Sequence, residues 1–124
     1  LPPATVKAMV RAKGPDRTVL ITDAMAAAGC APGRYTIGGA DCAVDEDGRV
    51  SLPGTPYLAG SSLTLDRAIE NTVRFTGLSI DEVIPMATTN PARWLGIETR
   101  GTVIAQWDAH AGRLDIRTVT STYP

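Results

Sequence analysis

The fold is set by residues 18–29, which read TVLITDAMAAAG. The apolar run Val19–Ile21 predicts a short strand buried on both faces, as in parallel sheets covered by helices. A carboxylate follows almost directly, at Asp23. In barrels and doubly wound sheets, the residues just beyond the carboxyl ends of the strands build the active site. Asp23 is therefore the first candidate catalytic residue.

A purely structural role for Asp23 is equally consistent with the sequence. Asp is a favoured helix N-cap, and the alanine-rich turn from Ala24 to Ala28 follows Asp23 before Gly29 closes the loop. Carboxylates at strand ends serve both purposes. These residues alone leave catalysis and capping open.

The composition limits the classes of protein to consider. With 124 residues, the chain can form one domain with a modest core, but not a closed eight-stranded barrel, which takes roughly 200 residues or more. The net charge is −1 and no basic stripe is interleaved with aromatic residues, so nucleic-acid binding gains no support. No apolar run approaches the ~20 residues of a membrane span, and no segment resembles a signal peptide. We expect a cytoplasmic protein without a membrane partner.

The rest of the chain alternates predicted helices with short predicted strands. Proline, glycine and capping residues predict helices at residues 2–13, 63–76 and 91–95. Asn90 is the predicted N-cap of the last of these. The capping box Ser79–Glu82 begins a further helix, which Pro85 should kink or shorten. Short β-like segments at residues 34–37, 41–44 and 49–52 predict a small hairpin insertion, and strands return at 102–105 and 114–120.

No local pattern predicts a metal site. The acidic cluster Asp45–Asp47 lacks the twelve-residue ligand spacing of a calcium loop and is expected to be a solvated turn. His110 stands alone, without the ligand spacing of a zinc site. Cys30 and Cys42 are too far apart for a CxxC motif, and we expect reduced thiols.

Three motifs occur in a fixed order along the chain. They are TDAM at residues 22–25 with Ala28 and Gly29, LAGSSLTLD at residues 58–66, and MATTNPAR at residues 86–93. Each motif alone is weakly specific. Together, in this order and spacing, they resemble the C-terminal part of the N-acetylglucosamine-6-phosphate deacetylase family of the amidohydrolase superfamily. The resemblance is close over residues 1–100 and looser towards the end of the chain.

This resemblance implies a fold and a reaction. The fold would be α/β: residues 1–99 would form the C-terminal part of a metal-dependent (β/α)8 TIM barrel with a β-hairpin insertion, and residues 100–124 would add strands of a small accessory β-sandwich. The reaction would be hydrolysis of the N-acetyl group of N-acetylglucosamine 6-phosphate to glucosamine 6-phosphate and acetate. The complete enzyme would be a homo-oligomer.

The resemblance also assigns site residues. Asp23 matches the family's catalytic aspartate, which takes a proton from a metal-activated water and later gives one to the leaving amine. Leu58, Ala59 and Gly60 match a segment that contacts the substrate, where small residues permit close approach of the backbone. Without the resemblance, this helix entry would be interpreted as an ordinary capped start.

The family implies a divalent metal, zinc or iron, whose ligands this chain does not supply. Those ligands, a Glu and two His, come from earlier strands, and a further substrate-contacting His would fall just before Leu1. A catalytic metal needs about three protein ligands, so Asp23 cannot bind it alone. We expect the isolated chain to be inactive.

Two other functions are consistent with the sequence. An amidohydrolase acting on a different amide would share the aspartate at the end of the last barrel strand. A non-catalytic truncated remnant, or a self-association module, is the alternative outside enzymology, since part of a barrel leaves sheet edges and apolar helix faces uncovered.

Overall fold

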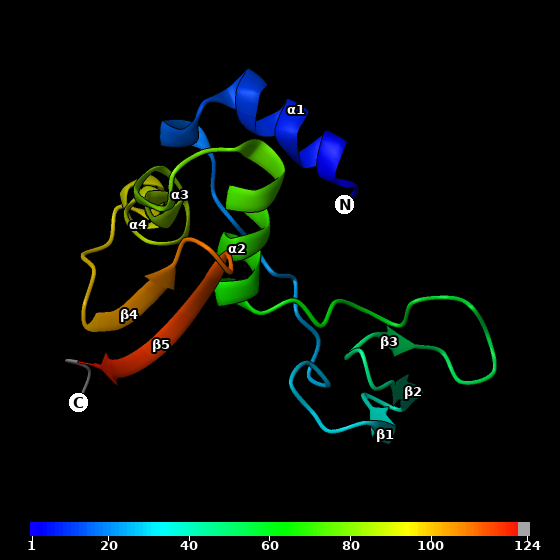
Figure 1. The fold of residues 1–124 in the computed structure, drawn as a ribbon. Coiled ribbons are helices and arrows are strands. Elements are labelled where there is room, and N and C mark those ends of the chain that lie inside the picture. Colours follow the sequence, from blue (N-terminus) through cyan, green and yellow to red (C-terminus); the bar gives the residue numbers. More distant parts are fainter. Residues whose placement is uncertain (122–124) are drawn as a thin grey trace. The chain divides into compact units, whose positions relative to one another are not determined.

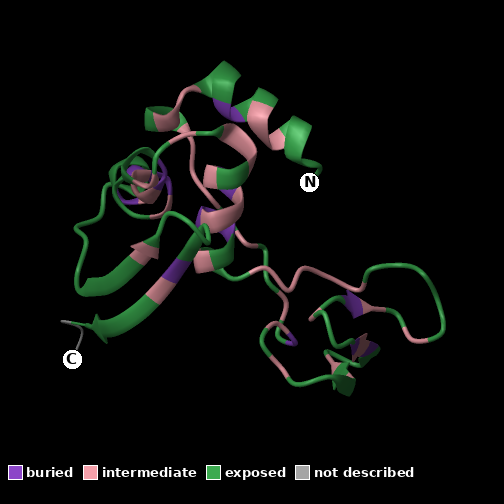
Figure 2. Ribbon diagram, viewed as in Figure 1, coloured by how far each residue is buried: buried purple, intermediate pink, exposed green. Residues whose placement is uncertain are grey.

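The computed structural model describes residues 1–121, and in this range the chain forms four α-helices, one 3₁₀ helix and five β-strands (Figure 1). The chain divides into two compact units. We call the first, Leu1–Ile21 with Asp66–Pro124, the helical unit, and the second, Thr22–Leu65, the small unit. Each unit contains its own cluster of buried apolar residues, coloured purple in Figure 2.

One apolar core joins three helices and one strand of the helical unit. The elements of this unit are α1 (Pro3–Lys13), the 3₁₀ helix η1 (Pro15–Arg17), α2 (Leu65–Thr76, whose first residue belongs to the small unit), α3 (Ile80–Ala87), α4 (Thr89–Leu95), β4 (Thr102–Asp108) and β5 (Arg113–Thr120). The buried core residues are Val10, Ile69, Val83, Met86 and Leu114. α3 contributes two of them because its apolar residues recur at helical spacing and form one face.

Local sequence signals set most of the helix boundaries. The Ser79 hydroxyl accepts the Glu82 N–H, and the Glu82 carboxylate accepts the Ser79 N–H at 2.8 Å, which confirms the predicted capping box. Gly77 has a φ of 79° and its N–H donates to the Val73 carbonyl oxygen, so glycine ends α2 as predicted. α3 ends two residues after Pro85, as a proline inside a helix favours. α2 begins at Leu65, two residues later than predicted.

The predicted strand at Val19–Ile21 is wrong. These residues form no strand, and the Leu20 N–H donates to the Met86 carbonyl oxygen of α3 at 2.9 Å. Ile21 is 75% exposed, against the expectation of burial on both faces. A strand in a parallel sheet needs a neighbouring strand to receive its backbone hydrogen bonds. No strand in residues 1–121 pairs with this segment, so an apolar run alone could not produce one.

Asn90 also differs from its predicted role as an N-cap. α4 begins at Thr89, so Asn90 lies inside the first turn, where it is only 5% exposed. Its Nδ2 donates to the carbonyl oxygens of Pro15 and Thr18, both at 2.8 Å. Asn90 therefore ties α4 to η1 and to the start of the segment that leads towards Asp23.

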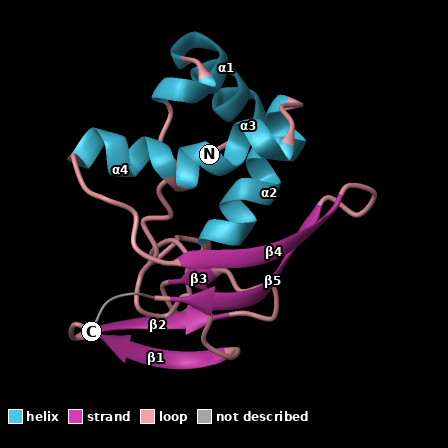
Figure 3. Ribbon diagram, turned by 90° about the vertical axis from the view of Figure 1, so that its left-hand side faces the viewer, coloured by secondary structure: helices cyan, strands magenta, loops and turns pink. Residues whose placement is uncertain are grey.

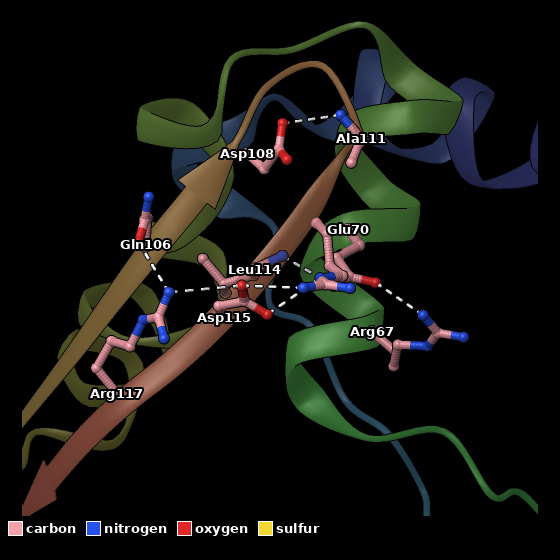
Figure 4. Close-up of polar contacts among 9 residues, drawn as sticks. Arg67, Glu70, Gln106, Asp108, Ala111, Leu114, Asp115 and Arg117 are labelled. Atoms are coloured by element: carbon pink, nitrogen blue, oxygen red, sulfur yellow. Dashed lines mark hydrogen bonds and ion pairs between the residues drawn. The ribbon is translucent and has the colours of Figure 1, made fainter.

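The last two strands form a hairpin attached to α2. β4 and β5 pair antiparallel, with an irregularity between Ile104 and Ala105, and β4 extends three residues beyond the predicted strand. Glu70 reaches from α2 to this hairpin, and its Oε1 accepts the Leu114 N–H at 2.9 Å (Figure 4). Glu70 Oε2 lies 3.3 Å from Arg67 Nη1. A largely buried carboxylate thus joins the helix to the backbone of β5.

The outer side of β5 carries an exposed ion-pair network. Asp115 lies between Arg113, at 3.0 Å, and Arg117, at 3.8 Å, and Arg117 also donates to the Gln106 side chain (Figure 4). The hydrogen bond from Arg113 holds the pKa of Asp115 below its usual value, and the same pairing raises the pKa of Arg113. Exposed pairs of this kind contribute little to stability.

The small unit contains a three-stranded antiparallel sheet. Its strands are β1 (Gly33–Ile37), β2 (Ala40–Val44) and β3 (Val50–Ser51), in the order β1-β2-β3 (Figure 3). These strands confirm the predicted hairpin insertion. The buried residues beneath them are Ala27, Cys42, Val44 and Val50. The acidic cluster is an exposed turn in which Asp45 Oδ1 accepts the Arg49 N–H, as expected.

The chain therefore has the mixed α/β organisation that the sequence predicts. None of its described helices is long and apolar enough to cross a bilayer. The assignment of residues 1–99 to a TIM barrel and of residues 100–124 to an accessory β-sandwich stays a prediction.

Candidate active site

The small unit brings two of the three sequence motifs together. Ala24 and Ser61 form an isolated parallel bridge, in which the Met25 N–H donates to the Ser61 carbonyl oxygen at 2.9 Å. The Ser61 hydroxyl donates to the Thr22 carbonyl oxygen at 2.8 Å. Asp23 and the segment Leu58–Gly60, predicted as catalytic and substrate-binding residues, therefore lie on two adjoining stretches of backbone.

Asp23 stands out by its backbone conformation. Its φ is 50°, and in residues 1–121 no other residue except glycine has a positive φ. This left-handed region costs an L-residue about 1 kcal/mol, although Asp tolerates it better than most. Such residues persist only where the surroundings impose them, and they cluster at functional sites.

The contacts around Asp23 do not support a capping role. The Ala24 N–H is directed to the Thr22 hydroxyl at 3.4 Å, and the part of the chain that the structure describes gives no hydrogen bond to the Asp23 carboxylate. The alanine-rich segment forms turns, with the Ala28 N–H donating to the Met25 carbonyl oxygen, and not a helix to be capped. The carboxylate is exposed and free to meet a ligand from solution.

The segment Leu58–Gly60 runs along the small sheet. Leu58 forms an antiparallel bridge with Ser51, and the Ala59 N–H donates to the Val50 carbonyl oxygen at 3.0 Å. Ala59 packs against the apolar core of the unit, whereas the Leu58 side chain is 64% exposed. Of the two side chains, only that of Leu58 is exposed to solvent to a large extent.

Gly60 has a packing reason to be glycine. A Cβ built at this position would lie 2.6 Å from the Met25 sulfur and 3.1 Å from its Cβ and Cγ. The Met25 side chain thus fills the space that a side chain at position 60 would need. The substrate contact expected of Gly60 from the resemblance stays a prediction, and would involve its backbone.

The other sequence candidates do not form a site. His110 is exposed, and Asp108 Oδ1 accepts the N–H groups of His110 and Ala111 at 2.9 Å, which makes a closed turn. Cys30 and Cys42 are free thiols, as expected. Across the described residues, no three His, Cys, Asp or Glu side chains gather into a group that could hold a metal ion.

Sequence reasoning missed Met25 and Ser61 as residues that shape the surroundings of Asp23. Both lie inside the quoted motifs, but their partners are 36 and 39 residues away along the chain. Small residues such as Gly60 and Ser61 fit a tight crossing of two backbones. Nothing in one sequence shows which two backbones cross.

The chain resembles known sugar-phosphate deacetylases. It is 47% identical over 83 residues to N-acetylgalactosamine-6-phosphate deacetylase of Escherichia coli O157:H7, covering 67% of this chain and 22% of that protein. It is 37% identical over 110 residues to N-acetylglucosamine-6-phosphate deacetylase of Lysinibacillus sphaericus, covering 89% of this chain and 28% of that protein. No family model matches the chain.

Solved structures agree with these relatives. An aspartate-to-alanine variant of the Mycobacterium smegmatis N-acetyl-D-glucosamine-6-phosphate deacetylase, in complex with N-acetyl-D-glucosamine-6-phosphate, superposes with a TM-score of 0.78 at 30% identity, over 98% of this chain and 33% of that one. The Thermotoga maritima enzyme gives a TM-score of 0.74 at 29% identity. The chain spans less than half the length of the relatives it matches. These findings confirm the resemblance, and the chain is homologous to one part of the N-acetylglucosamine- and N-acetylgalactosamine-6-phosphate deacetylases.

Proposed function

We propose that this chain is part of an N-acetylglucosamine-6-phosphate deacetylase and supplies its catalytic aspartate, Asp23. The observation that carries the proposal is the state of Asp23: an exposed carboxylate without a hydrogen bond to any described residue, on a backbone in an uncommon conformation, in a chain homologous to such deacetylases. The conformation contributes no stability of its own, which favours a role in chemistry.

The proposed reaction is amide hydrolysis. A water oxygen attacks the acetyl carbonyl carbon while Asp23 takes one proton from that water. The carbon–nitrogen bond then breaks, and Asp23 returns the proton to the leaving nitrogen, so acetate and glucosamine 6-phosphate are released. General acid–base catalysis by one carboxylate contributes about 10²–10⁴-fold to such a rate.

Leu58, Ala59 and Gly60 are the proposed substrate-binding residues. The Leu58 side chain offers apolar surface, for which the methyl of an acetyl group is a suitable partner, while Ala59 is engaged with the core. Because Met25 fills the space where a side chain at position 60 would lie, the proposed contact of Gly60 with the substrate is through its backbone. These three residues lie beside the Asp23 loop in the same unit.

The metal of the family does not fit these residues alone. Asp23 stands without further His, Cys, Asp or Glu partners in the region that the structure describes, and a catalytic zinc takes three protein ligands. The zinc or iron site therefore belongs to residues outside this chain. We further propose that residues 1–99 complete a (β/α)8 barrel, that residues 100–124 join a β-sandwich, and that the complete enzyme is a cytoplasmic homo-oligomer.

N-acetylgalactosamine 6-phosphate is the second candidate substrate. The relative of 47% identity carries that name, while the named N-acetylglucosamine-6-phosphate deacetylases are 35–40% identical to this chain. The two sugars differ only in the configuration of one hydroxyl, so the same Asp23 chemistry serves both.

A substrate panel tests the proposal. A full-length deacetylase that carries this segment is assayed for acetate release from both sugar phosphates, from unphosphorylated N-acetylglucosamine and from a cyclic amide. We expect turnover of one sugar phosphate to exceed that of the last two compounds by at least a hundredfold. Preference for the cyclic amide would identify a different amidohydrolase, and absence of turnover of all four would favour the non-catalytic remnant.

A further inference from the structure

We propose that Ser61 is a positioning residue that holds Asp23 in its left-handed backbone conformation. The inference rests on the proposed catalytic role of Asp23 and extends it to a residue that does not touch the reacting atoms. Ser61 lies 38 positions later in the sequence, on the neighbouring segment of the small unit.

Ser61 donates one hydrogen bond and accepts another, and together they fix the backbone on both sides of Asp23. Its hydroxyl donates to the carbonyl oxygen of Thr22, the residue before Asp23, at 2.8 Å. Its own carbonyl oxygen accepts the N–H of Met25, two residues after Asp23, at 2.9 Å. One residue thereby holds a backbone group before Asp23 and another after it.

The orientation of the Ser61 hydroxyl is determined by a third contact. The Leu63 N–H donates to the same oxygen at 3.2 Å. A hydroxyl has one hydrogen to donate and lone pairs to accept. Because Leu63 occupies the acceptor side, the hydrogen of Ser61 is directed to Thr22. Ser61 is half-buried, so water competes for these bonds less than at an open surface.

The neighbouring residue pair reinforces this arrangement. Met25 packs into the space above Gly60, where a Cβ would lie 2.6 Å from its sulfur. The chain after Asp23 is therefore held by a backbone hydrogen bond to Ser61 and by side-chain packing on Gly60. The Asp23 carboxylate makes no hydrogen bond to the described residues, so its φ of 50° is imposed by the backbone around it.

Loss of the Ser61 hydroxyl should remove the hydrogen bond to the Thr22 carbonyl oxygen and free the backbone on that side of Asp23. The carboxylate would then sample directions away from the substrate, which lowers the rate of the chemical step and leaves substrate binding largely unchanged. A misplacement of a catalytic group by about 1 Å costs up to roughly a hundredfold in rate. We expect Ser61→Ala to lower kcat by about ten- to a hundredfold, with KM changed by less than about twofold.

The test compares Ser61→Ala with Ser61→Thr, which keeps the hydroxyl, and with Ser62→Ala. Ser62 is the matched control because it is also half-buried and makes no hydrogen bond in the described part of the chain. We expect the threonine variant to restore most of kcat and the Ser62 variant to behave as wild type. A wild-type kcat in Ser61→Ala would overturn the proposal. A loss of kcat in Ser61→Thr or in Ser62→Ala as large as that in Ser61→Ala would overturn it as well.

A second measurement separates this proposal from the proposed function. In the 124-residue chain, NMR of wild type should show a positive φ at Asp23 and slow hydrogen exchange at the Met25 amide. Ser61→Ala should abolish the positive φ, while the Met25 amide, which donates to the backbone carbonyl oxygen of residue 61, should stay protected. A negative φ at Asp23 in wild type would contradict the positioning role even if the variant failed to fold. A full-length protein without deacetylase activity would contradict only the function.

Discussion

The helical unit and the small unit both contain a polar side chain that joins distant segments, but they use it differently. In the helical unit, Asn90 is buried and its two hydrogen bonds go to the carbonyl oxygens of Pro15 and Thr18. No residue in the described part of that unit, other than glycine, has a positive φ. In the small unit, Ser61 is only half-buried and brackets Asp23, whose φ is 50°.

This difference separates stability from function. The hydrogen bonds of Asn90 satisfy its own buried amide group and two partly buried backbone carbonyl groups. They also connect elements of one unit, so they stabilise the fold. Those of Ser61 maintain a conformation that is itself unfavourable and leave a carboxylate exposed. Substitution of Asn90 should therefore affect mainly the free energy of unfolding, and substitution of Ser61 mainly catalysis.

The largest effect on stability is expected at Asn90. Asn90→Ala removes the donor to two backbone carbonyl oxygens and should lower the free energy of unfolding by about 2–3 kcal/mol. Asn90→Asp should cost at least as much, because a carboxylate would face the same carbonyl oxygens without a donor. Urea unfolding of the 124-residue chain measures both variants.

Asn71→Ala is the control for Asn90. The Asn71 side chain accepts only from Arg74, at an exposed position three residues along the same helix, and its loss should cost less than about 0.5 kcal/mol. Equal losses at positions 71 and 90 would show that the tie between α4 and η1 does not stabilise the helical unit.

A matched pair of valines compares the two cores. Val83 and Val50 are 0% and 1% exposed, and each loses two methyl groups on truncation to alanine, which costs about 2 kcal/mol through lost burial and the cavity left behind. We expect the greater loss for Val83→Ala, because Val50 lies in a two-residue strand whose surroundings can relax.

Residue-specific hydrogen exchange checks the valine comparison. Val83→Ala should accelerate exchange in α1 to α3, and Val50→Ala in β1 to β3. If Val50→Ala costs more free energy of unfolding than Val83→Ala, the small unit has the more rigid core. The expectation that the surroundings of Val50 relax more easily is then wrong.

The smallest expected effect concerns pH and the capping box of α3. The hydrogen bonds from the Ser79 backbone N–H and hydroxyl hold the pKa of Glu82 below its usual value. A lowered pKa in the folded chain contributes stability above the unfolded pKa, and this contribution is lost as the pH falls through the folded pKa. As the pH is lowered below about 4.5, the midpoint temperature of thermal unfolding should thus fall less steeply for Glu82→Gln than for wild type.

Glu46→Gln provides the comparison for Glu82. Glu46 lies in the exposed turn between β2 and β3, and its side chain makes no hydrogen bond to the described residues. This variant should follow the wild-type pH profile. A profile for Glu82→Gln that coincides with wild type would mean that the carboxylate of the capping box does not contribute to acid sensitivity.

Sequence reasoning succeeded where a feature is encoded within a few residues. Gly77 ends α2, Ser79 and Glu82 form their capping box, and the turn at Asp45 joins two strands. It failed where the partner is distant: the apolar run at residues 19–21 found no neighbouring strand. The hydrogen bonds that join Asn90 and Ser61 to distant segments span 36 to 75 residues, so no local sequence pattern could predict them.

For the same reason, the sequence could indicate residues of a candidate site but not how they are arranged. The residue types and order of the TDAM and LAGSS motifs indicated Asp23 and Leu58–Gly60, but not that the two stretches adjoin through Ala24 and Ser61. Nor does the sequence show the φ of Asp23, because Asp is common in right-handed and extended conformations as well.

The activity of Asp23→Asn tests the central claim most directly. Asparagine has the same size, tolerates the same backbone conformation and caps turns equally well, so only the proton transfer is removed. In a full-length deacetylase that carries this segment, the substitution should lower kcat by about 10²–10⁴-fold with the free energy of unfolding unchanged. Asp47→Asn, in the exposed acidic turn, should leave kcat unchanged. A kcat within a few-fold of wild type in Asp23→Asn would contradict a catalytic role and leave Asp23 a structural residue.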